Sequence, residues 1–92
     1  MIKAHTLSSF WKAYGVLPED IRKSAKKAYR IWQQNPFHPS LHFKCVNHQE
    51  HVWSLRIALG YRAVGIYEAD TVTWFWVGDH ETYKRLIKGK LS

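Results

Sequence analysis

The segment from Trp53 to Tyr83 constrains the fold more than any other part of the chain, because it contains the pattern of three β-strands in succession. Apolar and polar side chains alternate along the first strand, as they do in a strand buried on one face. The third is a nearly continuous run of β-branched and aromatic residues, which is typical of a central strand buried on both faces. The predicted strands are residues 52–57, 61–67 and 71–77, with Gly78 breaking the last one.

A helix of about residues 18–34 is predicted before this segment. Pro18 followed by two acidic residues is typical of a first helical turn. Apolar side chains then recur at helical spacing and define one buried stripe: Ile21, Ala25, Ala28, Tyr29 and Trp32. Asn35 and Pro36 end the helix, because proline cannot donate a backbone hydrogen bond and it restricts the residue before it.

Shorter elements flank this helix. A first helix is expected to begin at Ser8 or Ser9, either of which is a suitable N-cap, and to end at Gly15. Strand character is weak over residues 2–6 and clearer over residues 43–46. Both helices therefore precede the main run of strands.

A last short helix is expected after the third strand. Asp79 is a suitable N-cap for a helix through about Ile87, and residues 88–90 are expected to fray. This order predicts an α+β domain in which two N-terminal helices pack on a small, mainly antiparallel sheet and a short helix closes the chain. A chain of 92 residues has room for one core, so residues 1–92 are expected to form a single domain.

The chain carries a strong positive charge. Fourteen Lys and Arg against seven Asp and Glu give a formal net charge of +7, with a pI near 9.8. This balance predicts an anionic partner, such as nucleic acid, an acidic protein or an anionic membrane surface. The alternative is a solvated basic surface that only promotes solubility.

Cysteine content and hydropathy indicate the compartment. The single cysteine, Cys45, excludes an internal disulfide, so a reducing compartment is expected. The first residues contain no apolar run long enough for a secretory signal. No stretch of about 20 apolar residues is present to span a membrane. A cytoplasmic protein that does not associate with a membrane is therefore expected.

Two arginines, a histidine and a tyrosine are expected to lie close together beside the sheet. If residues 58–60 form a hairpin connection, Arg56 and Arg62 lie near each other across it, because every second residue of a strand faces the same side. His80 and Tyr83 follow the neighbouring strand. Arginine grips a phosphate bidentately, histidine moves a proton near neutral pH, and tyrosine stacks on a base or orients a hydroxyl. This set of side chains suits a phosphodiester.

The chemistry expected of such a site needs no metal and no cofactor. No acidic cluster is available to hold Mg²⁺, which argues against a metal-dependent nuclease. A metal-free ribonuclease needs only acid–base catalysis and charge stabilisation, because RNA supplies its own 2′-hydroxyl as nucleophile. Structural readings of the same residues stay open: a strand arginine often packs along the surface, a histidine at a helix start often caps it, and a tyrosine often packs on the sheet. These features alone indicate a basic α+β domain that binds an anionic partner.

The other histidines do not predict a metal site. His38 and His42 are four residues apart, and His48 and His51 are three apart. The first pair lies in a proline-bounded loop, and no carboxylate or cysteine completes either set. Cys45 is expected to be a buried small hydrophobic residue in a strand.

The order of these segments resembles a known family. Two helices followed by a sheet that contains NPFHPSLHFK, WSLRI, GYRAVG and WFWVGDHETYKRL resemble the RelE/ParE superfamily of bacterial toxins from type II toxin–antitoxin modules, over about residues 6–87. RelE-like members cleave mRNA on the ribosome without a metal, and an antitoxin masks their active surface. The resemblance therefore implies a ribosome-dependent mRNA endonuclease that inhibits translation. Its implied partners are mRNA, the ribosome and an acidic antitoxin.

The resemblance also implies roles for individual residues. Arg62 matches the arginine of the YR strand motif and is expected to hold the scissile phosphate. His80 matches the catalytic position that follows the glycine at the end of the last strand. Tyr83 matches an aromatic position a turn later, which orients or stacks the substrate nucleotide. The residues expected to bind RNA are Arg56, in a supporting role, Lys44 and Arg85.

The chain departs from RelE on the strand before the YR motif. RelE has lysines there, whereas this chain has Val52 and Ser54. The departure removes a candidate general base and leaves Lys44, His48 and His51 as candidates to replace it.

The same departure keeps two other functions open. ParE-like members of the superfamily inhibit DNA gyrase and need no nuclease site, and a catalytically silent interaction protein would keep only the fold. His80 followed by Tyr83 favours the nuclease branch, because a gyrase inhibitor needs no proton-transfer residue at that position.

Overall fold

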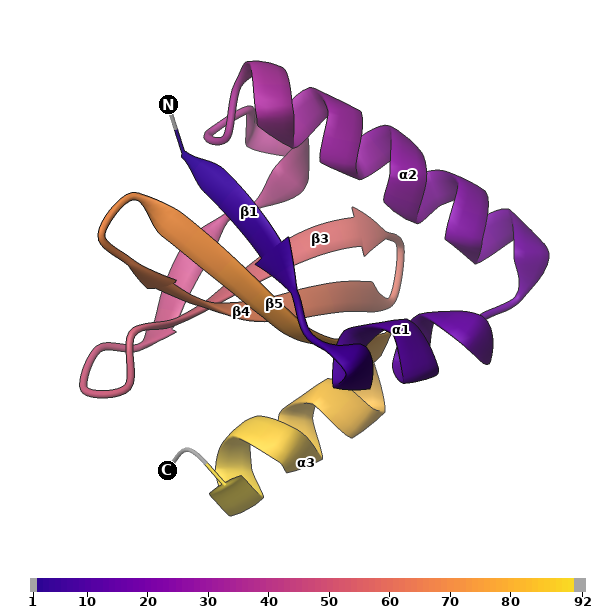
Figure 1. Cartoon of the computed structure of the whole chain (residues 1–92). Coiled ribbons are helices and arrows are strands. Elements are labelled where there is room, and N and C mark those ends of the chain that lie inside the picture. Colours follow the sequence, from indigo (N-terminus) through magenta and orange to yellow (C-terminus); the bar gives the residue numbers. More distant parts are fainter. Residues whose placement is uncertain (1, 91–92) are drawn as a thin grey trace.

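The fold contains helices on both faces of a single sheet (Figure 1). The computed structural model describes the backbone of residues 2–90 and the side chains of residues 2–86. Its elements are β1 (Lys3–Thr6), α1 (Ser8–Gly15), α2 (Glu19–Gln34), the 3₁₀ turn η1 (Pro39–Leu41), β2 (Lys44–Asn47), β3 (Val52–Ala58), β4 (Tyr61–Glu68), β5 (Thr71–Asp79) and α3 (His80–Lys90). The α+β architecture expected from the sequence is confirmed. No helix among the described residues is both long and apolar enough to cross a membrane.

Five strands form one mixed sheet in the order β1-β5-β4-β3-β2. The strands β2 to β5 are antiparallel neighbours, as expected. The first strand differs, because β1 runs parallel to β5, with Lys3 opposite Thr71 and Thr6 opposite Trp74. The weak strand pattern near the N-terminus therefore belongs to an edge strand, which pairs with the last strand of the chain, β5.

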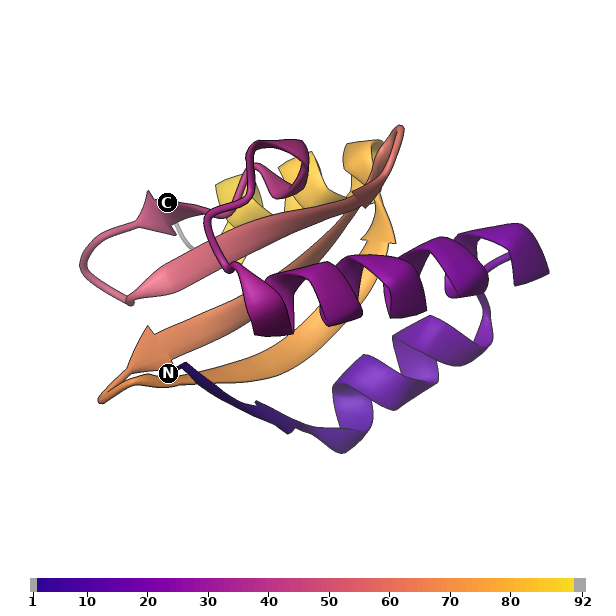
Figure 2. The same ribbon diagram turned by 90° about the horizontal axis from the view of Figure 1, so that it is seen from above.

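One face of the sheet is covered by α1 and α2, and the other by α3 (Figure 2). The core under α1 and α2 is aromatic. The ring of Trp32 in α2 meets Phe43 and Trp74 edge to face, with ring centroids 5.9 and 5.7 Å apart. Large rings bury much apolar area per residue, which is how a chain of this size fills its core. The helical stripe predicted for α2 is confirmed except at Tyr29: Ala28 and Trp32 are buried and Ile21 and Ala25 half-buried, whereas Tyr29 is exposed.

The opposite face, here called the site face, has a smaller core of Val52, Val64 and Tyr83. Here β5 is less buried than its sequence predicts. Its buried side chains, Val72, Trp74 and Val77, belong to the cluster under α1 and α2. The expectation of burial on both faces is therefore wrong, because α3 covers the site face only in part (Figure 2).

Two helix starts differ from the sequence prediction. Neither Ser8 nor Ser9 caps α1, whose N-cap is Leu7. The hydroxyl of Ser9 donates instead to the carbonyl of Phe75, at 2.7 Å, and so ties α1 to β5. Pro18 is the N-cap of α2 and not its first helical residue.

The end of the chain also differs. Gly78 does not break the last strand, because it is paired with Arg62 of β4 and β5 continues to Asp79. The helix α3 begins at His80 and runs to Lys90, so the tail expected to fray after Ile87 is helical.

Candidate functional site

A β-bulge in β5 decides which side chains reach the site face. Val64 of β4 pairs with Trp76, whereas its neighbour Gly65 pairs with Trp74, so Phe75 is an extra residue without a partner in β4. By simple alternation, Trp74 and Trp76 would share a face. The bulge separates them: Trp74 lies in the core under α2, and Trp76 packs against the smaller cluster on the site face.

Arg62 is held on the site face by two contacts. Its Nη1 donates a hydrogen bond to Oγ of Ser54 on the neighbouring strand, at 2.9 Å, and Ser54 is completely buried. Its guanidinium carbon lies 5.6 Å from the centroid of the Tyr83 ring, within the range of a cation–π contact. The arginine is therefore fixed between β3 and α3.

Arg56 lies directly across the sheet from Arg62, as the hairpin prediction requires. Like charges placed opposite each other on a sheet repel. No ion pair within the described residues involves either arginine. Beyond Ser54, the edge of β3 has no partner in β2. At this open edge Arg56 borders a cavity of about 410 Å³ beside α2, which Lys27 also lines. An anion between the two guanidinium groups would relieve the repulsion.

His80 and Tyr83 face each other across the first turn of α3. Their rings are stacked, with centroids 5.6 Å apart and an angle of 29° between the planes. Tyr83 is only 7% exposed, whereas His80 is half-buried. The backbone N–H of His80 donates to the carbonyl of Gly60 at 2.8 Å, which anchors the start of α3 to the β3–β4 hairpin.

Asp79 caps α3 as the sequence predicts. Its Oδ2 accepts a hydrogen bond from the backbone N–H of Thr82 at 3.3 Å. The hydrogen bond from the hydroxyl of Thr82 has the largest effect on the pKa of the Asp79 carboxyl and lowers it. Burial opposes this with a smaller effect, and backbone N–H groups, including that of Thr82, lower the pKa further. The helix start that carries His80 and Tyr83 is thereby fixed.

The two predicted RNA-binding residues beyond this cluster are placed differently. Lys44 is exposed and lies opposite Ser54, so it shares the site face with Arg62. Arg85 is exposed and donates to Oγ1 of Thr82 at 3.3 Å. It is rotated by about 200° around the helix axis from Tyr83, because successive residues of an α-helix turn by about 100°. Arg85 is therefore not part of the cluster.

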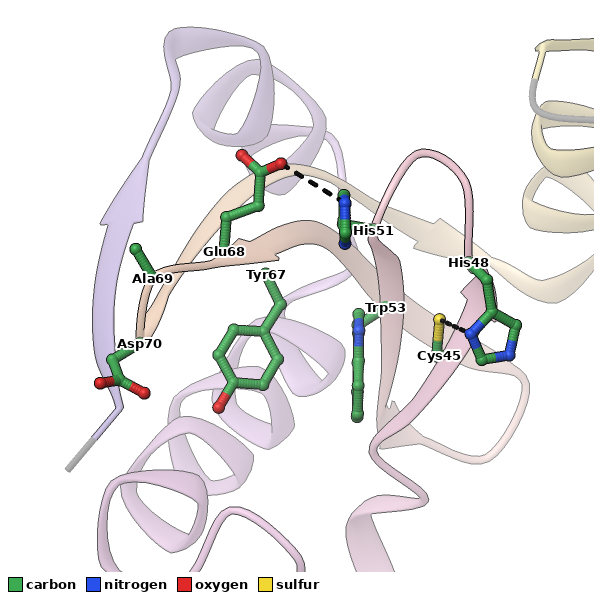
Figure 3. Close-up of a pocket in the computed structure, with 8 residues that line it drawn as sticks. All are labelled: Cys45, His48, His51, Trp53, Tyr67, Glu68, Ala69 and Asp70. Carbon is green, nitrogen blue, oxygen red and sulfur yellow. Dashed lines mark hydrogen bonds and ion pairs between the residues drawn. The ribbon is translucent and has the colours of Figure 1, made fainter.

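His48 and His51 line a hollow of about 520 Å³ at the far end of the hairpins (Figure 3). Half-buried Cys45 contacts Nδ1 of His48 at 3.6 Å, and His51 approaches Glu68 at 3.8 Å. The aromatic walls of this hollow, Trp53 and Tyr67, pack against the core on the face opposite Arg62. The two histidines are thus not brought to the cluster. In the part of the chain that the structure describes, no three metal-ligating side chains come together.

A groove of about 580 Å³ runs between the helices and the sheet on the face away from Arg62. Its apolar walls come from α1, α2 and the strands, and they include Phe10, Trp11 and Tyr29. Trp11 is 53% exposed, although its indole N–H donates to Oγ1 of Thr6. This is a surface suited to an apolar partner rather than to a phosphate.

The site face offers a positioned cation, Arg62, on β4. The imidazole of His80 and the phenol of Tyr83 lie beside it, within the first turn of α3. Three residues expected to act together, Arg62, His80 and Tyr83, are in mutual contact through the tyrosine ring. The arrangement is able to hold a phosphate, to move a proton and to orient a ribose hydroxyl.

Sequence reasoning missed the parts played by Ser54 and Trp76. Ser54 is a departure from the RelE pattern, yet it is the hydrogen-bond acceptor for Arg62. Trp76 reaches the site face only through the bulge, which no pattern in the sequence announces.

The comparisons with known proteins agree with this fold. The ParE-like toxin domain family matches residues 19–85. The toxin–antitoxin complex RelB–RelE from Methanococcus jannaschii is similar, with 18% identity, a TM-score of 0.71 and coverage of 87% of this chain and 94% of that one. None of the curated proteins matches the chain in sequence.

Two further solved structures show the same architecture. The isolated RelE toxin from E. coli has 18% identity and a TM-score of 0.64, over 99% of this chain and 100% of that one. The YoeB/ParE toxin from Agrobacterium tumefaciens has 16% identity and a TM-score of 0.65, over 86% and 99%. The family match covers most of the chain, so the protein belongs to the ParE-like toxin domain family, and it shares its fold with the RelE toxins.

Proposed function

We propose that this protein is the toxin of a toxin–antitoxin module and that it cleaves mRNA on the ribosome without a metal. The observation that carries the proposal is the contact of Arg62 and His80 with the same ring, that of Tyr83. A protein that only binds a partner has no need of an imidazole placed beside a fixed guanidinium.

In the proposed reaction the 2′-hydroxyl of the RNA attacks the adjacent phosphorus. Its oxygen bonds to phosphorus while its proton passes to water, and the bond from phosphorus to the 5′-oxygen breaks. His80 gives a proton to that leaving oxygen, and Arg62 balances the charge that develops on the phosphate. Tyr83 orients the nucleotide. Arg56 and Lys44 hold the neighbouring phosphates.

The proposed partner is an acidic antitoxin in the cytoplasm. A chain with a net charge of +7 attracts an acidic protein and steers its association. The similar structure from M. jannaschii is itself a complex of a toxin with its antitoxin.

Primer extension on a defined message tests the proposal. The purified protein is added to a reconstituted translation reaction, with and without ribosomes, as wild type, Arg62→Ala and His80→Ala. We expect cleavage in the ribosomal A-site codon by the wild type only. His80→Ala should lose at least about a hundredfold in rate, because one positioned acid–base group contributes about 10²–10⁴-fold. Arg62→Ala should lose about 10²–10³-fold, because it removes a group that stabilises the charge of the transition state.

Matched controls come from the same residue types elsewhere. Arg30→Ala on the exposed side of α2 and His5→Ala on exposed β1 remove the same side chains without touching the cluster. Both should cleave like the wild type. A message left intact by the wild-type protein would refute the nuclease, and full activity of Arg62→Ala and His80→Ala would refute the site.

The family match favours a second candidate function, inhibition of DNA gyrase, because the matching domain is described as ParE-like. This function needs a binding surface and no proton transfer. A gyrase supercoiling assay with the same variants separates the two: inhibition that survives His80→Ala, together with an intact message, supports the gyrase inhibitor. A protein inactive in both assays is a silent interaction domain.

A further inference from the structure

Trp76 stands beside the proposed phosphate site because of two features of β5. The bulge at Phe75 turns its side chain to the site face. Gly78, two residues later, leaves room for the indole to lie along the strand: a Cβ on Gly78 would overlap Cζ2 of Trp76 and would lie 2.7 Å from its Cη2.

The position of Gly78 places this ring next to Arg62. Gly78 is the direct partner of Arg62 in the sheet, and side chains of directly opposite residues lie on the same face about 4.5–5.5 Å apart at Cβ. The six-membered ring of Trp76 therefore occupies the space in which a side chain opposite Arg62 would lie. This large aromatic ring is only half-buried.

We infer that Trp76 is a stacking platform for a nucleobase of single-stranded RNA, adjacent to the phosphate held by Arg62. The inference rests on the proposed function, because it takes RNA as the substrate. Aromatic rings bind bases through stacking that is tolerant of sequence. The base stacked on this ring would belong to one of the two nucleotides that the phosphate held by Arg62 joins. Tyr83, which is nearly fully buried, has much less ring surface to offer.

The bulge gives the inference its physical basis. Bulges often lie next to active sites, where they redirect a side chain. If Phe75 were paired in regular alternation, the indole of Trp76 would point into the core under α2 together with Trp74. The sheet thus loses regular pairing at this point, and the result is an aromatic ring beside Arg62.

The test uses the full-length protein and a hexaribonucleotide with 2′-O-methyl groups, which cannot be cleaved through its 2′-oxygens. A base stacked on an indole quenches its fluorescence. We expect the oligonucleotide to quench the wild type. Trp76→Phe and Trp76→Leu both lack this indole and should show no quenching beyond that of the other tryptophans, while Trp76→Phe keeps more of the affinity. The dissociation constant should rise about tenfold in Trp76→Leu. Trp11→Leu, a tryptophan of α1 on the other side of the sheet, is the control and should bind like the wild type.

Cleavage kinetics give a second readout. In the ribosomal reaction Trp76→Phe and Trp76→Leu should raise KM for the message by up to about tenfold and leave kcat within about twofold, whereas Arg62→Ala lowers kcat. Gly78→Ala, which displaces the indole without removing it, should act like Trp76→Leu if it keeps the wild-type unfolding midpoint. Trp76→Phe retains most of the packing and serves if the other variants do not fold.

The outcomes separate this inference from the proposed nuclease. Cleavage by the wild type with unchanged KM and unchanged quenching in Trp76→Phe and Trp76→Leu overturns the platform and leaves the nuclease intact. An uncleaved message overturns the nuclease, and the oligonucleotide then decides the platform alone: quenching lost in Trp76→Leu supports it, and absence of quenching in the wild type refutes it.

Discussion

Arg62 Nη1 donates a hydrogen bond to Ser54 Oγ over 2.9 Å, and no part of Ser54 reaches solvent. RelE has a lysine on this strand, which would repel Arg62. In this chain a small neutral acceptor turns the guanidinium to a defined orientation instead. Ser54 is therefore a positioning residue: it acts on a bound phosphate only through Arg62.

Ser54→Ala tests this relationship. A hydrogen bond to a charged group is worth about 1.5–3 kcal/mol, so we expect the cleavage rate to fall by about tenfold or more. The dependence of the cleavage rate on ionic strength should change as well, because a guanidinium that is no longer held in place binds the phosphate less well. The measurement is single-turnover cleavage at several salt concentrations. Ser24→Ala, at a half-buried position of α2, is the control. Equal cleavage rates for the two variants would contradict the role given to Ser54.

Tyr83→Phe separates the hydroxyl from the ring. The ring packs on Val52 and Val64 and contacts Arg62, so removing it in Tyr83→Ala should cost about 3–5 kcal/mol in the free energy of unfolding. Tyr83→Phe keeps these contacts, and we expect wild-type stability with slower cleavage. Urea unfolding and cleavage rates measured on the same samples distinguish the two effects. Tyr29→Phe, at an exposed position of α2, should change neither the stability nor the cleavage rate.

The cap of α3 predicts a dependence of stability on pH. The pKa of Asp79 is lowered by its hydrogen bonds with Thr82, so the unfolded state binds its proton more tightly than the folded state. The stabilisation is complete above the unfolded pKa of about 3.9 and is lost as the pH falls through the lower folded pKa. Asp79→Asn caps the helix without titrating. Its stability relative to the wild type should therefore improve as the pH is lowered from about 5 to 3. Urea midpoints at each pH measure this, and a constant difference would contradict it.

Two glycines predict opposite changes in stability. A Cβ on Gly65 would lie 2.7 Å from Cγ1 of Val72 and 2.9 Å from the carbonyl oxygen of Thr73, so Gly65→Ala should destabilise the protein by about 1–3 kcal/mol. A Cβ on Gly15, at the end of α1, would meet open space, with no neighbouring atom within 4 Å. Gly15→Ala should therefore stabilise by up to about 1 kcal/mol, because it restricts the unfolded chain. Midpoints of urea unfolding that move in the same direction for both would contradict this reading.

The sequence predicts the architecture well because its patterns are local. The stripe of apolar residues in α2 reports directly on which side of that helix is buried. The alternation in β3 predicts burial on one face only, and this is wrong, because Val52 and Ser54 are buried on the site face as well. Arg56 and Arg62 are paired as the sequence predicts, but by a different route. The expected connection is residues 58–60, whereas Ala58 pairs with Tyr61 and Ile57 is an extra residue between the two pairs.

Long-range and irregular features escape such patterns. The pairing of β1 with β5 joins residues nearly seventy positions apart, and nothing in Lys3 to Thr6 specifies that partner. The bulge at Phe75 follows from packing on both faces at once, so the sequence Trp74-Phe75-Trp76 does not reveal which ring turns to the site face. The contact between Arg62 and Ser54 could not be predicted from the sequence either, because it depends on how deeply β3 is covered.

The parallel pairing of β1 with β5 has a consequence for biosynthesis. Because a protein is made from its N-terminus, β1 waits without a partner until residues 71–74 have been synthesised. His80 and Tyr83 are made later still, in α3. A nascent chain therefore carries α1, α2, Arg56 and Arg62 well before it carries a complete site. Under the proposed function, the chain therefore cannot act on a message before residues 80–83 have been synthesised.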